Sequence, residues 1–175
     1  TELARAIFGA DLLYAGEILF QGKTVNIRKP SDAVRLGIGF VTEDRKRQGL
    51  LLQHSICFNI SLPILPKLSK MLVVDKKQEQ ACAQEQKEAL YIKTPNLEVA
   101  ANSLSGGNQQ KVVLAKWLAT KCKVLFMDEP TRGIDVAAKQ EIYKLMNELT
   151  RNGIAIVMIS SEMEELLGMS DRLLI

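Results

Sequence analysis

The strongest constraint on the fold is a regular alternation of apolar runs with an amphipathic segment in the last third of the chain. Residues 124–127 (VLFM) and 154–159 (IAIVMI) are short apolar runs of the kind found in buried strands. The segment 135–150 between them carries apolar side chains at helical spacing, namely Ala138, Ile142, Leu145, Met146 and Leu149. Strands that alternate with amphipathic helices build parallel sheets covered by helices on both faces. We therefore expect an α/β fold around a mostly parallel sheet.

The first 44 residues predict smaller elements of the same kind. A helix over residues 2–8 is stopped by a glycine, and residues 17–20 and 23–25 form a small antiparallel β hairpin. Residues 30–37 then predict a short helix, which leads into an apolar strand at 38–41. We assign residues 1–44 to the β-containing part of the core.

Residues 45–104 have no strand pattern and predict an α-helical insert. We expect a loop over 44–54 and a broken helix over 55–70, because Pro63 and Pro66 interrupt it. Asp75 then caps a polar helix over 76–91. Residues 105–175 form the remainder of the core, beginning with a helix opened by Ser105 and ending in a strand at 172–175.

Composition excludes some functions. The net charge of +3 and the scattered basic residues argue against a nucleic-acid partner. Cys57, Cys82 and Cys122 lie far apart in no metal-ligand spacing, so we expect reduced thiols in a cytosolic protein. Since the sequence contains neither a signal-peptide pattern nor an apolar run near ~20 residues, we expect any membrane crossing to be done by other chains or segments.

The first candidate site is the sequence LSGGNQQK at residues 104–111. A hydroxyl residue and two glycines before a helix make a good anion site, because the helix N-terminus presents unpaired N–H groups and glycines allow a phosphate to approach closely. An ordinary capped helix start is the alternative for a bare S-G-G, and the full octapeptide is more specific.

The second candidate site is VLFMDEP at residues 124–130, where two carboxylates follow an apolar strand. Parallel sheets bind ligands at the carboxyl ends of their strands. Asp128 can hold Mg²⁺, and Glu129 can orient or deprotonate a water that attacks a terminal phosphate. The alternative is a strand that ends in solvated acids.

Two further polar segments follow these acids. TRGID at residues 131–135 either caps the next helix through Asp135 or forms a loop that communicates with a partner subunit. The sequence ISSE at residues 159–162 places Ser161 after the second apolar strand, where a helix cap is again the alternative.

In their order and spacing, these four segments resemble the motifs of ABC-type ATPases, which have a P-loop NTPase-like core. LSGGNQQK resembles the signature, VLFMDEP the Walker B strand, and TRGID the D-loop, while ISSE occupies the place of the switch-histidine loop. Together with VTEDRKRQGLL at 41–51, the sequences of these motifs resemble the second nucleotide-binding half of the double ATPase subunits of sugar importers. ATP and Mg²⁺ are the implied cofactors.

The resemblance assigns roles to individual residues. It implies that Glu129 is catalytic and that Asp128 holds the metal for the ATP bound in cis. It implies that the signature residues serve the ATP of the partner half. The implied nucleotide-contacting set is Ser105, Gly106, Gly107, Asn108, Gln109, Glu43, Asp135 and Ser161.

The sequence departs from the family pattern in three places. No Walker A sequence G-x-x-x-x-G-K-[ST] occurs, and Thr1 stands where its last residue would fall, so we expect that loop upstream of this chain. Glu43 replaces the Q-loop glutamine, and Ser161 replaces the switch histidine. His54, the only histidine, is not expected to be catalytic. We expect both ends to be cut and the isolated chain to be inactive.

The implied partners are the other nucleotide-binding half, a membrane permease and, indirectly, a sugar-binding protein, at the cytoplasmic face of a bacterial-type membrane. Residues 48–52 and 56–60 offer apolar side chains that either dock on the permease or pack the insert against the core. Two other functions remain open: an ABC ATPase that acts on nucleic acid or ribosomes without transport, and a non-catalytic regulatory half. The sequence does not name the sugar.

Overall fold

A parallel sheet of three strands forms the centre of the computed structural model, which describes residues 1–71 and 73–174. Its strands β3 (Ile38–Val41), β6 (Val124–Asp128) and β7 (Ala155–Ile159) are arranged in the order β3-β6-β7. The register aligns Phe40 with Phe126 and Phe126 with Val157. The predicted parallel sheet is therefore confirmed, and the carboxyl ends of all three strands meet at one edge.

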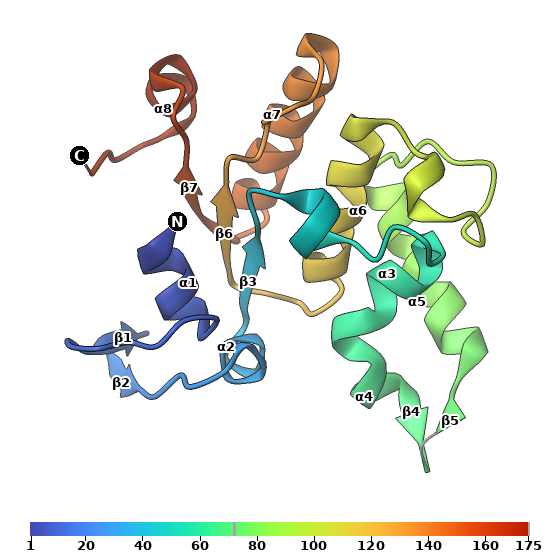
Figure 1. Ribbon diagram of the computed structural model, residues 1–175, viewed down its shortest axis with the longest axis horizontal. Helices are drawn as coiled ribbons and strands as arrows, with labels where there is room; N and C mark the ends of the chain where they lie inside the picture. The colour runs from blue at the N-terminus through green and yellow to red at the C-terminus, as the bar shows by residue number, and fades with distance from the viewer. Residues whose placement is uncertain (72, 175) are drawn as a thin grey trace.

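Helices lie on the two sides of this sheet (Figure 1). Helices α6 (Gly106–Leu118) and α7 (Val136–Arg151) cover one side, and α1 (Glu2–Phe8) packs against β3 from the other. The rings of Phe8 and Phe40 lie 5.5 Å apart between α1 and β3. The carboxyl end of β6 leads directly into the loop that precedes α7.

The predictions for the last two strands, at 154–159 and 172–175, are partly wrong. Strand β7 forms, but Ala155 is exposed and Val157 is 42% exposed, so this is not a buried strand. The reason is its place at the end of the strand order, where α7 covers one face only. Residues 172–174 form no strand, and Ile175 lies outside the described residues.

The expected elements of residues 1–44 are all present. Helix α1 ends at Gly9, whose φ of 76° lies in the left-handed region. Strands β1 (Ile18–Phe20) and β2 (Lys23–Val25) pair antiparallel across a two-residue turn. Helix α2 (Pro30–Leu36) then leads into β3, so the predicted order is confirmed.

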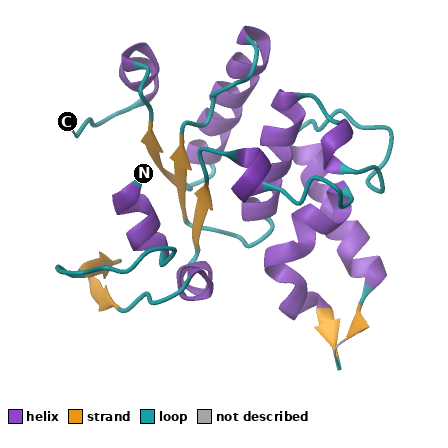
Figure 2. Cartoon of the chain, viewed as in Figure 1, coloured by secondary structure: helices purple, strands orange, loops and turns teal. Residues whose placement is uncertain are grey.

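Helices dominate residues 45–104, as predicted (Figure 2). They are the π-helical turn η1 (Arg45–Gly49), α3 (Ile56–Ser61), η2 (Leu62–Ile64), α4 (Leu65–Leu68), α5 (Lys76–Ala89) and η3 (Ala101–Ser103). Two features correct the sequence analysis. The expected loop at 44–54 contains η1, and a short antiparallel pair, β4 (Ser69–Lys70) with β5 (Val73–Val74), interrupts the helices. Two-residue strands are too short to produce a recognisable alternation.

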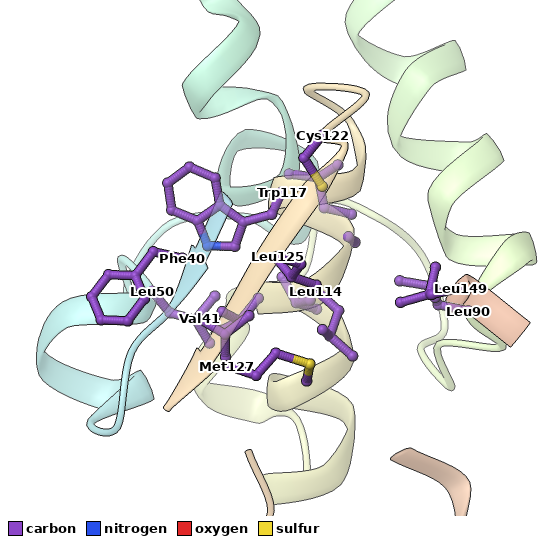
Figure 3. Close-up of a cluster of buried hydrophobic side chains, with 14 of the residues drawn as sticks. Phe40, Val41, Leu50, Leu90, Leu114, Trp117, Cys122, Leu125, Met127 and Leu149 are labelled. Carbon is purple, nitrogen blue, oxygen red and sulfur yellow. The ribbon is translucent and has the colours of Figure 1, made fainter. Parts of the chain in front are cut away.

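The core lies between the sheet and α6 (Figure 3). Leu114 of α6 and Leu125 and Met127 of β6 are fully buried. Helix α6 also packs against α3 and α5, so it joins the insert to the sheet. Ile56 and Ile60 are likewise fully buried, which shows that this part of 56–60 packs the insert and does not offer an apolar docking face.

The remaining helix is α8 (Met163–Met169), which follows β7. Among the helices of residues 1–71 and 73–174, none has the length and apolar character needed to cross a membrane.

Candidate functional site

Ser105 begins the first candidate site as the N-cap of α6. Its Oγ accepts hydrogen bonds from the backbone N–H of Asn108 at 3.5 Å and from Nδ2 of the same residue at 3.0 Å. The cap leaves the side chain of Ser105 exposed at the start of the helix. Ser105 is therefore an exposed cap at the start of α6, and a helix N-terminus at a polar surface is a place where anions can bind.

The two glycines of this site allow close packing against the loop before α7. A Cβ at Gly106 would lie 2.9 Å from Nη2 of Arg45 and 3.3 Å from the carbonyl oxygen of Gly133. A Cβ at Gly107 would lie 2.7 Å from Cβ of Ala138. A Cβ at Gly107 would collide with Cβ of Ala138, and one at Gly106 would require Arg45 and Gly133 to shift, so both glycines have a structural role besides any contact with a phosphate.

Asn108 and Gln109, both predicted to contact nucleotide, make hydrogen bonds inside the fold. Oδ1 of Asn108 accepts a 2.8 Å bond from the N–H of Lys93 in the insert. Gln109 is 5% exposed, and its Nε2 donates to the carbonyl oxygens of Ala101 and Leu104. These contacts give both side chains a structural role in holding the insert on α6.

Asp128 ends strand β6 and is almost completely buried. Only 1% of its surface is exposed, and within the described structure neither carboxylate oxygen has a hydrogen-bond partner. A carboxylate buried without a partner is costly, and such sites usually hold a cation or another missing partner. The side chain is thus available to a ligand at the edge of the sheet.

Glu129 follows directly and is fixed from both sides. Its φ is 48°, and its backbone N–H donates a 2.8 Å hydrogen bond to the carbonyl oxygen of Ile159 on β7. Its Oε1 accepts a 2.7 Å bond from the backbone N–H of Ser161. The structure therefore brings the predicted residues Glu129 and Ser161 together, although the hydroxyl of Ser161 is not the donor.

Sequence reasoning missed a buried carboxylate beside this pair. Glu165 of α8 is 5% exposed and accepts hydrogen bonds from Thr131 Oγ1, at 2.9 Å, and from Ser160 Oγ. It ties the segment after the paired acids to the end of β7. Thr131 and Glu165 are 34 residues apart, and no local pattern predicts such a contact.

Glu43 lies at the carboxyl end of β3 and forms an ion pair with Arg132. Next to it, Arg45 donates to the carbonyl oxygens of Arg132 and Gly133. Asp135 caps α7 by accepting a 2.9 Å bond from the N–H of Ala138. Residues 131–135 are therefore held between the segment 43–45 and the start of α6. Arg45 was not predicted as a site residue.

Two groups of residues result. Gly106 lies beside Gly133 and Gly107 beside Ala138, whereas Asp128 and Glu129 lie with 159–161. Among the described residues, no hydrogen bond or ion pair joins Ser105 to either acid. The sequence Gly22-Lys23-Thr24 is part of the β1–β2 hairpin and not of a strand–loop–helix unit, so it does not form a phosphate-binding loop.

The sequence model of the family described as "ABC transporter" matches residues 1–132. The chain belongs to this family. LSGGNQQK and VLFMDEP, which resemble the signature and the Walker B strand, lie inside the matched residues, whereas TRGID, which resembles the D-loop, extends beyond them.

Curated relatives are similar over the whole chain. The ribose import ATP-binding protein RbsA of Bacillus licheniformis is 57% identical over 175 residues, and that of Bacillus subtilis is 54% identical. A putative ribose/galactose/methyl galactoside import ATP-binding protein of Rhizobium etli is 50% identical. The chain spans about a third of these relatives, 36% of the two Bacillus proteins and 33% of the Rhizobium protein.

Solved ABC cassettes share the fold. A nucleotide-free ATP-binding cassette from an ABC transporter superposes with a TM-score of 0.82 at 20% identity, covering 97% of this chain and 69% of that one. A dimeric cassette bound to ADP and phosphate gives a TM-score of 0.75 at 21% identity, covering 93% of this chain and 70% of that one. The ABC cassette fold expected from the motifs is confirmed.

Proposed function

We propose that this chain is part of the ATPase subunit of an ABC importer that powers uptake of a monosaccharide. The observation that carries the proposal is the pair of acids at the end of β6: Asp128 is buried with free oxygens, and Glu129 is fixed in place beside it. The names of the relatives, which are ribose import ATP-binding proteins, support a sugar as the cargo.

Asp128 fits a magnesium ion. Mg²⁺ is bound by one or two carboxylates together with phosphate oxygens and water, and Asp128 offers two buried oxygens that no donor among the described residues satisfies. The ion, when bound, would neutralise charge on the transferred phosphoryl group. The role of Asp128 is then to hold the ion at the edge of the sheet.

Glu129 is the proposed catalytic residue. The N–H of Ser161 holds one carboxylate oxygen, which leaves the other free to orient or deprotonate a water. That water attacks the γ-phosphate of ATP, the bond to the ADP oxygen breaks, and the proton passes toward Glu129. Since Ser161 replaces the usual histidine and Glu43 replaces the usual glutamine, we infer that this half is a slow catalyst in cis.

The signature supplies the second part of the function. Ser105 is exposed at the start of α6, and within the described structure it makes no hydrogen bond to Asp128 or Glu129. We infer that Ser105, Gly106 and Gly107 bind the ATP held by the partner half. The dimeric cassettes of the same fold support a two-half arrangement.

The proposed partner on the membrane side is a permease, with this subunit peripheral at the cytoplasmic face. Gln48, Leu51 and His54 are exposed around η1, and Leu51 is 43% exposed. Cysteine at Gln48 or at His54 in the full-length protein should crosslink to the permease. Failure of both positions to crosslink, while the complex still assembles, would contradict this docking site.

Steady-state ATP turnover of the full-length protein assembled with its permease tests the proposal. We expect Ser105→Arg to abolish turnover and sugar uptake, and Glu129→Gln to remove the share of turnover that belongs to this half. Wild-type turnover in Ser105→Arg would contradict the signature role. Unchanged turnover in Glu129→Gln would instead indicate a regulatory half.

A further inference from the structure

The guanidinium of Arg45 lies between the signature and the D-loop, and among the described residues it forms no ion pair with a carboxylate. Nη1 donates to the carbonyl oxygen of Arg132 at 2.7 Å, and Nη2 donates to that of Gly133 at 2.9 Å. The neighbouring carboxylates are engaged elsewhere, Glu43 with Arg132 and Asp44 with Arg47. Arg45 therefore donates both hydrogen bonds to backbone oxygens, of residues that lie 87 and 88 positions further along the chain.

Burial makes this arrangement costly. It lowers the pKa of Arg45, against the opposing charge of Asp44, and within the described structure Nε is buried without a hydrogen-bond partner. A planar guanidinium can donate to two adjacent carbonyl groups at once, which the single ammonium of lysine does less well. Arginine therefore suits this geometry better than lysine does.

The signature makes room for this side chain. A Cβ at Gly106 would approach Nη2 of Arg45 to 2.9 Å and the carbonyl oxygen of Gly133 to 3.3 Å. The first glycine of the signature is thus packed against both members of the Arg45–Gly133 hydrogen bond. A larger side chain at residue 106 would therefore require Arg45 and Gly133 to shift.

The turn η1, which carries Arg45, is fixed to α6, the helix that begins in the signature. Asp44 caps η1 by accepting from the N–H groups of Lys46 and Arg47. At its far end, Nζ of Lys116 on α6 donates a 2.8 Å hydrogen bond to the carbonyl oxygen of Gly49. Helix α6 thus holds η1 at Gly49, and η1 holds the D-loop through Arg45.

We propose that Arg45 is a positioning residue that keeps the D-loop in register with the signature, so that both segments reach the partner's ATP together. Arg45 acts through the backbone of residues 132–133 and does not touch the nucleotide. This inference rests on the proposed function of the signature.

Hydrogen exchange in the full-length protein tests the link between Arg45 and residues 132–133 without a measurement of activity. In Arg45→Ala we expect faster exchange of the amides of 131–135 and 105–108, with the rest of the sheet unchanged. Arg47→Ala is the matched control, because the side chain of Arg47 is 88% exposed in the same turn. Equal exchange in the two variants would overturn the proposal.

Kinetics separate positioning from simple structural support. We expect Arg45→Ala to lower kcat by about tenfold, because misplaced groups lose transition-state contacts, while KM for ATP and Tm stay near the wild-type values. Arg45→Lys should recover only part of this loss. An unchanged kcat, or a fall in Tm that accounts for the lost activity, would overturn the proposal.

A substitution of Gly106 gives the most specific test of the link between Arg45 and residues 132–133. Gly106→Ala should reduce kcat by crowding Arg45 and Gly133, and the loss should be smaller when Arg45 is already alanine. Fully additive losses of kcat would show that Gly106 and Arg45 act independently, which would overturn the proposal. If instead Ser105→Arg leaves turnover intact, the proposed signature role fails, although the exchange result can still hold.

Discussion

The backbone N–H of Ser161 donates a 2.7 Å hydrogen bond to Oε1 of Glu129 at the carboxyl end of β6. The contact uses the main chain at the position where the ABC family usually has a histidine side chain. The orientation of the proposed catalytic carboxylate therefore does not depend on the identity of residue 161, as long as its N–H remains.

The first prediction follows from this main-chain contact. Ser161→Ala keeps the N–H and should leave the kcat of the full-length protein within about twofold of wild type. Ser161→Pro removes the donor and should lower the share of turnover that belongs to this half by at least about tenfold, since one hydrogen bond to a charged group is worth about 1.5–3 kcal/mol. Steady-state ATP turnover measures both. Equal losses in the two variants would mean that the hydroxyl matters instead.

The second prediction concerns the two free oxygens of Asp128. Asp128→Asn removes a buried charge and should raise the free energy of unfolding without nucleotide by about 1–3 kcal/mol. With Mg-ATP the order should reverse, because only the wild type gains stability from the bound ion. Urea unfolding of the full-length protein under both conditions measures this.

Asp171→Asn is the matched control for Asp128→Asn, because Asp171 is exposed. We expect this control to change stability under neither condition. A loss of stability in Asp128→Asn without nucleotide would show that the carboxylate is satisfied in a way that the described contacts do not include.

The local parts of this structure could be predicted from the sequence, whereas the long-range contacts could not. Ser105, Asp75 and Asp135 cap helices as expected, because a cap involves only the next three residues. The link from Arg45 to Gly133 joins residues 88 positions apart, and no periodicity carries that information. The exposure of β7 was missed because apolar composition does not tell a central strand from an edge strand.

The third prediction tests the packing of the second signature glycine. Gly107→Ala places a methyl group 2.7 Å from Cβ of Ala138 and should destabilise the protein by about 1–3 kcal/mol. Adding Ala138→Gly removes the opposing methyl group and should recover part of the loss, less the cost of about 1 kcal/mol for glycine in a helix. Tm of the single and double variants measures the recovery, and no recovery would contradict the packing account.

The fourth prediction uses the ion pair that joins α6 to α7. Nζ of Lys111, which is 5% exposed, lies 2.7 Å from Oε2 of Glu141, which is 45% exposed. Glu141→Gln leaves a buried ammonium without its counter-charge and should destabilise by about 1–2 kcal/mol. Lys111→Met should cost less, because water can solvate the freed carboxylate. Urea unfolding at pH 7 ranks the two, and the opposite order would refute this reasoning.

The same pair predicts a pH dependence. The hydrogen bond from Lys111 and its charge lower the pKa of Glu141 below the ordinary value of 4.5, against the effect of burial. The carboxylate therefore contributes stability above pH 4.5, and that contribution is lost as the pH falls through the folded-state pKa. The Tm difference between wild type and Glu141→Gln should be constant above about pH 5.5 and shrink below pH 4.5. A difference that grows in acid would contradict the assignment.

The most direct test of the central claim asks which half of the full-length protein loses ATP when Ser105 becomes arginine. Photolabelling with 8-azido-ATP, followed by peptide mapping, reports each nucleotide site separately. If the signature serves the partner's ATP, Ser105→Arg should abolish labelling of the other half and leave labelling of this half at the wild-type level. Loss of label from this half, or unchanged label in both, would contradict the account.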